Sequence, residues 1–292
     1  MKKLHMIDRP LGGATRQRGL TLVELMVAMT LGLVVVLGVV YVFSGARASH
    51  RHQESYSAIQ EAGRIALEVL AREARMAGNT GCGSVAYMTH LSGPSEPPVA
   101  GELVFNNDVA ISAVEGGGAV ADQFTVVYGS PEQTGVVTSA ANQIQVASVP
   151  ALEINRALTA GDPVLINDCV NTEIATVQSV AGDVITLQAN LANEPRPGAL
   201  VMRLERSTFS VDANGQLLRN GVALVGGVRD MQLLYGIATS ASDRSAVQYV
   251  DAADPAFLPA DVVAMKVALS VQDGEIPTRN FSSTITLRNR AP

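Results

Sequence analysis

A single carboxylate, Glu24, stands near the start of a long apolar run that extends to residue 43. Two basic residues, Arg16 and Arg18, and then Gly19 come just before it. An acidic side chain in a membrane-embedded helix costs about 2 to 3 kcal/mol, so it is usually there for a function. An unpaired charge in apolar surroundings is costly, so this carboxylate needs a cationic partner.

The chain has 292 residues, a formal net charge of -6 and no Trp. Its second half is rich in Val, Ala, Gly and Thr, a composition that leans toward strands. No basic face is visible, which argues against direct binding of nucleic acid. The N-terminal flank is basic, and such a flank stays in the cytoplasm. We therefore expect the part of the chain after residue 43 to be exported.

The N-terminal segment has two simpler interpretations, a secretory signal peptide and a plain membrane anchor. A secretory signal peptide has an apolar run of roughly 7 to 15 residues followed by a cleavage site with small residues. The run over residues 25–43 is longer, and its end offers only a poor site of that kind. A plain membrane anchor fits the length, because a helix over residues 20–43 would be about 36 Å long. A plain anchor does not explain why Gly19 and Glu24 are present.

The segment 19–26, Gly-Leu-Thr-Leu-Val-Glu-Leu-Met, resembles the type IV prepilin signature. The resemblance implies that a membrane peptidase cuts between Gly19 and Leu20 on the cytoplasmic side, after which the new amine of Leu20 is N-methylated. It also implies that Glu24 serves assembly by pairing with a Leu20 amine. The chain departs from the family at Leu20, where Phe is usual, and its leader is long.

The chain is predicted to have three parts: a cleaved leader (1–19), a long helix (20–78) and a β-rich head (79–292). The membrane-spanning segment is expected at about residues 22–43. Beyond it, one apolar stripe recurs at helical spacing. Its members are Ile59, Ala62, Ala66, Leu70, Ala74 and Ala77. Arg64, Glu68 and Arg72 are spaced to pair on the exposed side, and Gly78-Asn79 is a suitable helix stop.

The head is predicted to be an antiparallel β-sheet, so the fold class is α+β with a pilin-like helix packed on the sheet. Residues 263–271 alternate between apolar and other types, as in a half-buried strand, and residues 281–287 repeat the pattern. Asn214-Gly215 and Asn220-Gly221 are predicted hairpin turns. Further strands are expected at 124–128, 144–147, 164–166, 173–180, 184–187, 200–204, 209–211, 217–219 and 222–225. The order of the strands in the middle of the head is not predicted.

The chain has two cysteines, Cys82 and Cys169. Export to an oxidising compartment favours a disulfide between them, with two buried free thiols as the alternative. Two thiols without a nearby His argue against a metal site. The sequence contains no catalytic motif of the common types. The motifs G-x-S-x-G, H-E-x-x-H, the Walker loop and C-x-x-C are all absent. We expect no enzymatic activity and no cofactor.

Three segments near the C-terminus, 225–236, 262–270 and 284–290, resemble PilW-like minor pilins. The implied function is a minor pilin of a type IV pilus, which primes or joins the filament in pilus biogenesis, motility and adhesion. Alternatives are a minor pseudopilin of a type II secretion system, a tip adhesin module that binds a surface ligand and, more distantly, an anchored periplasmic enzyme.

The resemblance also implies partners and places in the cell. The partners are other minor and major pilins through the helix, the prepilin peptidase, and the assembly platform of the inner membrane. The chain would cross the bacterial inner membrane once with its head in the periplasm, and would lie in the cell-surface pilus after assembly.

Overall fold

The structure is a computed structural model, and it describes residues 19, 21–82, 90–92, 110–118, 120–153, 156–169, 171–238, 245–274 and 276–289. It divides into two compact units, Met1–Glu54 and Ser55–Pro292. The division falls inside the long helix α1 (Leu22–Met76). A long apolar helix followed by antiparallel sheet confirms the predicted fold class.

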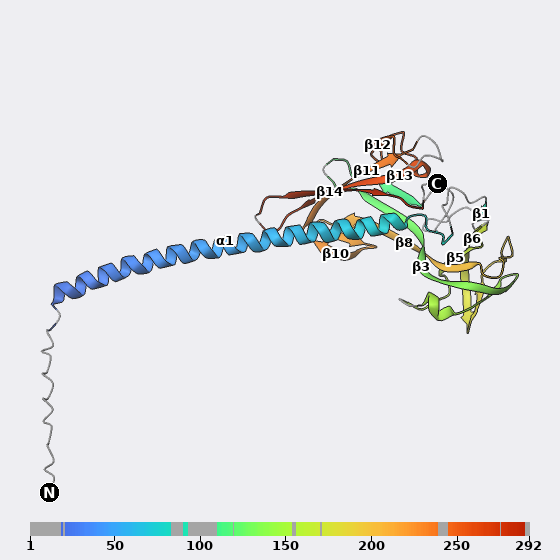
Figure 1. The fold of residues 1–292 in the computed structure, drawn as a ribbon, viewed down its shortest axis with the longest axis horizontal. Helices are drawn as coiled ribbons and strands as arrows, with labels where there is room; N and C mark the ends of the chain where they lie inside the picture. Colours follow the sequence, from blue (N-terminus) through green and yellow to red (C-terminus); the bar gives the residue numbers. More distant parts are fainter. Residues whose placement is uncertain are drawn as a thin grey trace, which may run out of the picture. The chain divides into compact units, whose positions relative to one another are not determined.

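The strands and short 3-10 helices follow in chain order (Figure 1). They are β1 (His90–Ser92), β2 (Ile111–Val114), β3 (Gln123–Ala140), β4 (Gln143–Val146), η2 (Val149–Leu152), β5 (Pro163–Asn167), β6 (Asn171–Ala181), β7 (Val184–Leu187), β8 (Leu200–Val211), β9 (Gln216–Arg219), β10 (Val222–Gly226), β11 (Val228–Ile237), β12 (Gln248–Val250), η3 (Pro259–Asp261), β13 (Val262–Val271) and β14 (Arg279–Thr286).

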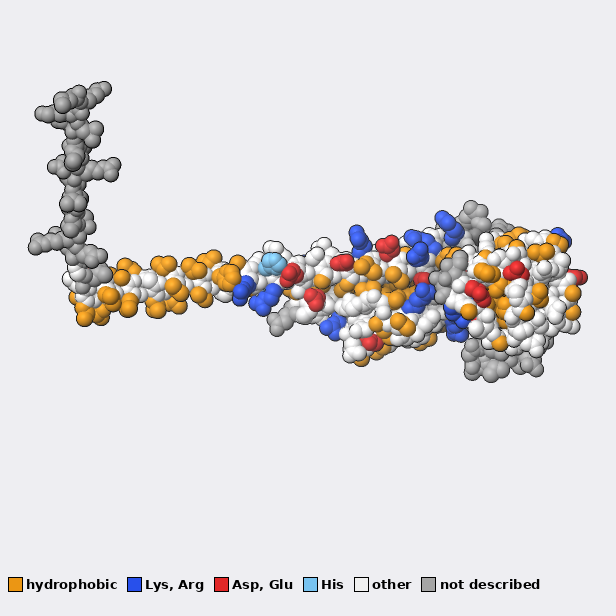
Figure 2. All heavy atoms as spheres, turned by 90° about the horizontal axis from the view of Figure 1, so that it is seen from below, with side chains coloured by type: hydrophobic (Ala, Val, Ile, Leu, Met, Phe, Trp, Pro, Cys, Tyr) orange, Lys and Arg blue, Asp and Glu red, His pale blue; other side chains and the backbone are white. Residues whose placement is uncertain are grey.

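The first half of α1 exposes apolar side chains all around the helix. Every residue from 22 to 43 is exposed, and Figure 2 shows hydrophobic side chains along this part of the helix. By length and composition α1 is apolar enough to cross a membrane. A helix that is apolar on every side needs an apolar environment around it, either lipid or other helices.

The second half of α1 buries the predicted stripe. Ile59, Ala66, Leu70 and Ala74 are each at most 1% exposed and join one core with strands of the head. Three buried residues lie beside the stripe and were not predicted. They are Gly63, Ala71 and Glu73. The pairs expected between Arg64, Glu68 and Arg72 do not form in the described structure.

A four-stranded antiparallel sheet, in the order β12-β11-β13-β14, shares this core. Alternate residues of β13 point inward, as the period-two pattern predicted, and alternate residues in the middle of β11 do the same. Buried examples are Met231, Leu233, Met265 and Val267. Strand β14 runs beside the second half of α1 (Figure 1), where Gly63 faces the ring of Phe281.

The middle of the head forms a closed barrel that the sequence did not predict. Strands β8, β5, β6, β7, β4 and β3 pair in that order, and β3 pairs back onto β8. Ile144, Val164, Val177, Ile185 and Val201 are fully buried in its separate core. Closing the sheet satisfies the strand edges within the ring. Strands β3 and β8 are long enough to serve both cores, since Phe124 stacks on Phe209 in the core beneath α1.

The two predicted hairpin turns are confirmed. Asn214-Gly215 joins β8 to β9, and Asn220-Gly221 joins β9 to β10. Asn220 and Gly221 both have positive φ, 50° and 77°, which a tight turn between antiparallel strands requires. The Asp212 carboxylate accepts hydrogen bonds from the backbone N–H groups of Asn214 and Gln216, so it fixes the first turn.

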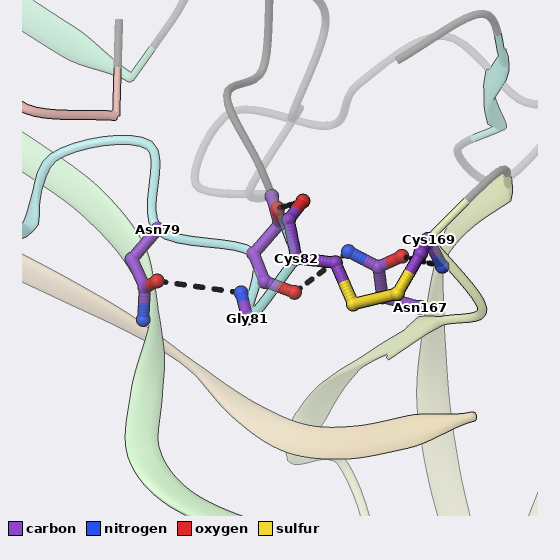
Figure 3. The surroundings of a disulfide bond; sticks show 6 residues. Asn79, Gly81, Cys82, Asn167 and Cys169 are labelled. Atoms are coloured by element: carbon purple, nitrogen blue, oxygen red, sulfur yellow. Dashed lines mark hydrogen bonds between the residues drawn. A yellow bond between two sulfur atoms is a disulfide. The ribbon is translucent and has the colours of Figure 1, made fainter. Parts of the chain in front are cut away.

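A disulfide joins Cys82, just beyond α1, to Cys169 between β5 and β6 (Figure 3). Asn167 supports this junction from a fully buried position. Its Nδ2 donates to the Thr80 carbonyl at 2.7 Å, and its Oδ1 accepts from the Cys169 N–H at 2.6 Å. The end of α1 is therefore fixed to the barrel by a covalent bond and by this amide side chain.

Replacing Gly63 by Val should lower the stability of the head. A Cβ at this position would lie 2.6 Å from ring atoms of Phe281, and overpacking of this kind typically costs about 1 to 3 kcal/mol. Chemical denaturation of the detergent-solubilised chain would measure the loss. Gly45→Val is the matched control, because nothing lies within 4 Å of its added Cβ. Equal stability of the two variants would contradict the close approach.

Cys82→Ser or Cys169→Ser alone should each lower the free energy of unfolding by about 4 kcal/mol. The bond closes a loop with a sequence separation of 87, and the chain-entropy account gives this magnitude. The double variant should lose no more than either single variant, because one bond is broken in all three. Additive losses, or free thiols in the oxidised wild-type protein, would contradict the pairing.

Candidate functional site

The N-terminus of α1 is where the sequence placed the processing and assembly residues. Gly19 is exposed and has no positive φ, and nothing lies within 4 Å of a Cβ added there. Neither its conformation nor its surroundings within the described chain require glycine. A requirement for glycine here would therefore come from a second molecule. Leu20, the predicted site of methylation, lies outside the described residues.

Thr21 caps the helix, a role that the sequence analysis missed. Its Oγ1 accepts a hydrogen bond from the backbone N–H of Glu24 at 3.3 Å. The Thr-x-x-Glu spacing is that of a capping box, in which the acidic side chain returns a bond to the backbone of the capping residue. That second bond does not form in the described structure, so capping does not occupy the carboxylate.

Two aliphatic hydroxyl groups in or next to the apolar segment are satisfied inside the helix, unlike Glu24. Thr30 Oγ1 donates to the Val27 carbonyl and Ser44 Oγ to the Tyr41 carbonyl, each at 2.9 Å. Such bonds are what polar groups in an apolar medium require. Among the described residues, no partner contacts the Glu24 carboxylate. The helix therefore presents one acidic group in an otherwise apolar surface, free to pair with a cation from outside the described chain.

The end of the apolar segment is marked by charged side chains. The Arg47 guanidinium lies 4.3 Å from the centroid of the Phe43 ring, and His50 Nδ1 lies 3.4 Å from a carboxylate oxygen of Glu54. Tyr41 is 81% exposed and lies just inside this boundary. An amphipathic aromatic residue followed by a cation is typical of a membrane–water interface.

A family profile described as the prokaryotic N-terminal methylation motif matches residues 14–40. The match includes the residues before the proposed cut, Glu24 and most of the apolar segment. It supports a type IV pilin-like or pseudopilin protein. The motif implies processing by a prepilin peptidase and assembly with other pilins, and together with the apolar helix it fits anchoring in the inner membrane before assembly. No curated protein and no solved structure matches the chain.

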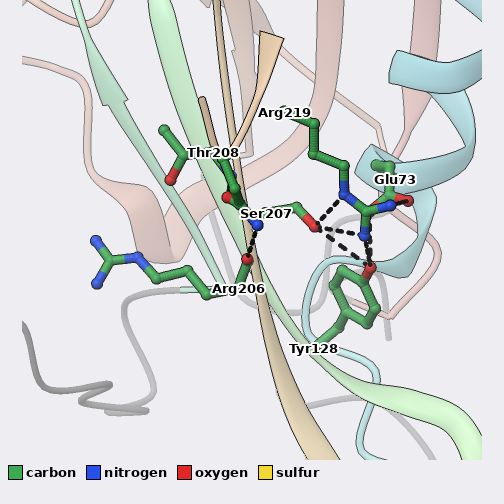
Figure 4. A network of polar contacts seen from close by, with 7 residues as sticks. Glu73, Tyr128, Arg206, Ser207, Thr208 and Arg219 are labelled. Carbon is green, nitrogen blue, oxygen red and sulfur yellow. Dashed lines mark hydrogen bonds and ion pairs between the residues drawn. The ribbon is translucent and has the colours of Figure 1, made fainter. Parts of the chain in front are cut away.

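The head holds a polar network that the sequence did not predict (Figure 4). Glu73 of α1, 8% exposed, accepts a hydrogen bond from the Tyr128 hydroxyl at 2.7 Å and pairs with Arg219 of β9 at 3.3 Å. Arg219 also donates to the Ser207 hydroxyl at 2.9 Å and to Tyr128 at 3.1 Å. The four residues come from four elements, so no local sequence pattern joins them.

This network attaches the end of α1 to strands shared by the barrel and the helix-covered core. Burial and the neighbouring Glu73 carboxylate raise the pKa of Tyr128 to about 12, although the hydrogen bond with Ser207 and the charge of Arg219 act in the opposite direction. The phenol therefore stays protonated at ordinary pH and remains a donor to Glu73. A carboxylate with an ion pair and a charge-assisted hydrogen bond is satisfied despite its burial.

Tyr128→Phe should lower the free energy of unfolding by about 1.5 to 3 kcal/mol, because the buried Glu73 carboxylate loses a donor. Tyr249→Phe makes the same chemical change at a residue that is 43% exposed, and it should be near neutral. Denaturant unfolding of both variants would measure the difference. Equal effects of the two variants would mean that the hydroxyl of Tyr128 does not stabilise the head.

Proposed function

We propose that this chain is a minor pilin of a type IV pilus, of the PilW-like type, that joins or primes the filament. The observation that carries the proposal is the exposed apolar half of α1, with one carboxylate, unpartnered among the described residues, inside the matched methylation motif. The resemblance of the C-terminal segments to PilW-like proteins supports the finer assignment. The head contains a barrel in addition to the helix-covered sheet and is therefore bulky. A bulky head hinders the regular packing of many copies in a filament, which favours a subunit present in few copies.

The proposed mechanism is assembly rather than catalysis. The chain is held in the inner membrane by α1, with its head in the periplasm. Cleavage after Gly19 gives Leu20 a free amine, which is then methylated. Apolar helices of several subunits then bundle, and Glu24 pairs with an N-terminal amine, which sets the axial register between neighbours. After assembly the subunit lies in the cell-surface pilus and contacts other minor and major pilins.

The motif match is equally compatible with a minor pseudopilin of a type II secretion system. The two functions differ in what fails when the protein is removed. A minor pilin deletion should abolish surface pili and twitching while leaving secretion intact. Loss of secretion with normal piliation would instead assign the chain to the secretion system.

Gly19→Ala should block processing, because a side chain at the scissile bond would crowd the peptidase. The unprocessed form should migrate more slowly on a denaturing gel than the wild type. Gly32→Ala is the matched control within the same apolar helix, since nothing lies near its added Cβ. This control should be processed normally, and equal mobility of Gly19→Ala and wild type would contradict the cleavage site.

Glu24→Gln and Glu24→Ala should both be processed yet enter pili at about a tenth of the wild-type level or less. An amine left unpaired in apolar surroundings costs a few kcal/mol, and about 1.4 kcal/mol already gives a tenfold change. Gln keeps the size of the side chain but removes the charge. Glu54→Gln, an exposed acid further along α1, should assemble normally. Normal incorporation of Glu24→Gln, measured in sheared pili, would reject charge pairing.

A further inference from the structure

A cavity of about 650 Å³ lies in the head, bordered by the end of α1 and by β3, β8 and β9. Its lining includes four guanidinium groups and three carboxylates. The guanidinium groups belong to Arg72, Arg156, Arg203 and Arg219. Guanidinium groups are permanently charged and are suited to bidentate binding of carboxylate or phosphate. What the cavity can bind depends on which of these cations the protein already neutralises.

Two of the arginines have carboxylate partners within the head. Arg219 pairs with Glu73 at 3.3 Å, and Arg156 donates to Asp162 at 2.8 and 3.3 Å. Burial opposes ionisation of Asp162, yet the Thr159 N–H and the Arg156 guanidinium hold its pKa below the ordinary value. These two cations are therefore already committed to structural contacts.

Arg203 has no such partner. It is 3% exposed, and its Nη2 donates to the Arg156 carbonyl at 3.0 Å. Its Nε is buried and makes no hydrogen bond within the described structure. Glu205 also lines the cavity, but no ion pair joins it to Arg203. A buried charge without an ion-pair partner is costly, so an anion bound in the cavity would stabilise this guanidinium.

Arg72 provides a second uncommitted cation. It is exposed on the last turns of α1, lines the same cavity, and forms no ion pair among the described residues. Glu132 and Glu205 also border the cavity, so the surface is not uniformly basic. This mixture disfavours a polyanion, which would bring further charges against the acids. It suits one compact oxyanion.

We propose that this cavity binds a single oxyanion group, a carboxylate or a phosphate, with Arg203 as the buried donor and Arg72 as a second cation. The sequence alone predicts no role for Arg72, because an arginine on an exposed helix face is usually only solvated. What distinguishes Arg72 is that it lines the same cavity as a buried, partly unsatisfied guanidinium. This inference is independent of the pilin proposal, since it concerns the head alone.

The test is isothermal titration calorimetry of the full chain in detergent. The chain is titrated with inorganic phosphate and, separately, with acetate, both at constant ionic strength. We expect saturable binding of at least one probe to a single site. Arg203→Gln should weaken that binding at least tenfold. Arg206→Gln is the matched control, because Arg206 lies on the same strand, is exposed, and extends away from the Glu73–Arg219 network (Figure 4).

If Arg203→Gln does not fold, a second pair decides the question. Arg72→Gln should weaken binding severalfold, whereas Arg75→Gln, an exposed neighbour on α1 outside the cavity lining, should not. The relative response to phosphate and acetate identifies which oxyanion the site prefers. The proposal is overturned if neither probe binds saturably, or if each control weakens binding as much as its partner variant.

Discussion

The structure depends on one helix that must satisfy two different surroundings. Residues 22–43 of α1 expose apolar side chains on every side. Exposing apolar surface to water costs about 25 cal/mol for each Å². The second half of the helix has a single buried stripe in the head core. The first half needs lipid or other apolar helices around it, and in those surroundings the Glu24 carboxylate needs a cationic partner.

The head is attached to the second half of α1, and to the segment that follows it, by several kinds of interaction. Small residues allow close packing, and Gly63 permits contact with the ring of Phe281. The buried Glu73 connects the last turns to β3 and β9 through Tyr128 and Arg219. Beyond the helix, the disulfide fixes the chain to the barrel.

Local patterns in the sequence predicted much of this, and contacts distant in sequence account for what was missed. The stripe from Ile59 to Ala77, the alternation in β13 and the Asn-Gly turns are set by nearest neighbours, and the structure confirms them. The barrel depends on pairing between β3 and β8, more than 60 residues apart. The Glu73 network and the Arg203 cavity depend on the same long-range pairing, so no short motif indicates them. The cap at Thr21 could have been predicted from its Thr-x-x-Glu spacing.

The central claim is that a peptidase and a methyltransferase act at the start of this helix, so that an amine becomes available to the lone carboxylate. Mass spectrometry of the N-terminal peptide, from protein recovered in sheared filaments, tests it most directly. The account predicts a peptide that begins at Leu20 and carries one additional methyl group on its amine. A peptide that still contains Arg18 and Gly19 ahead of Leu20 would contradict it.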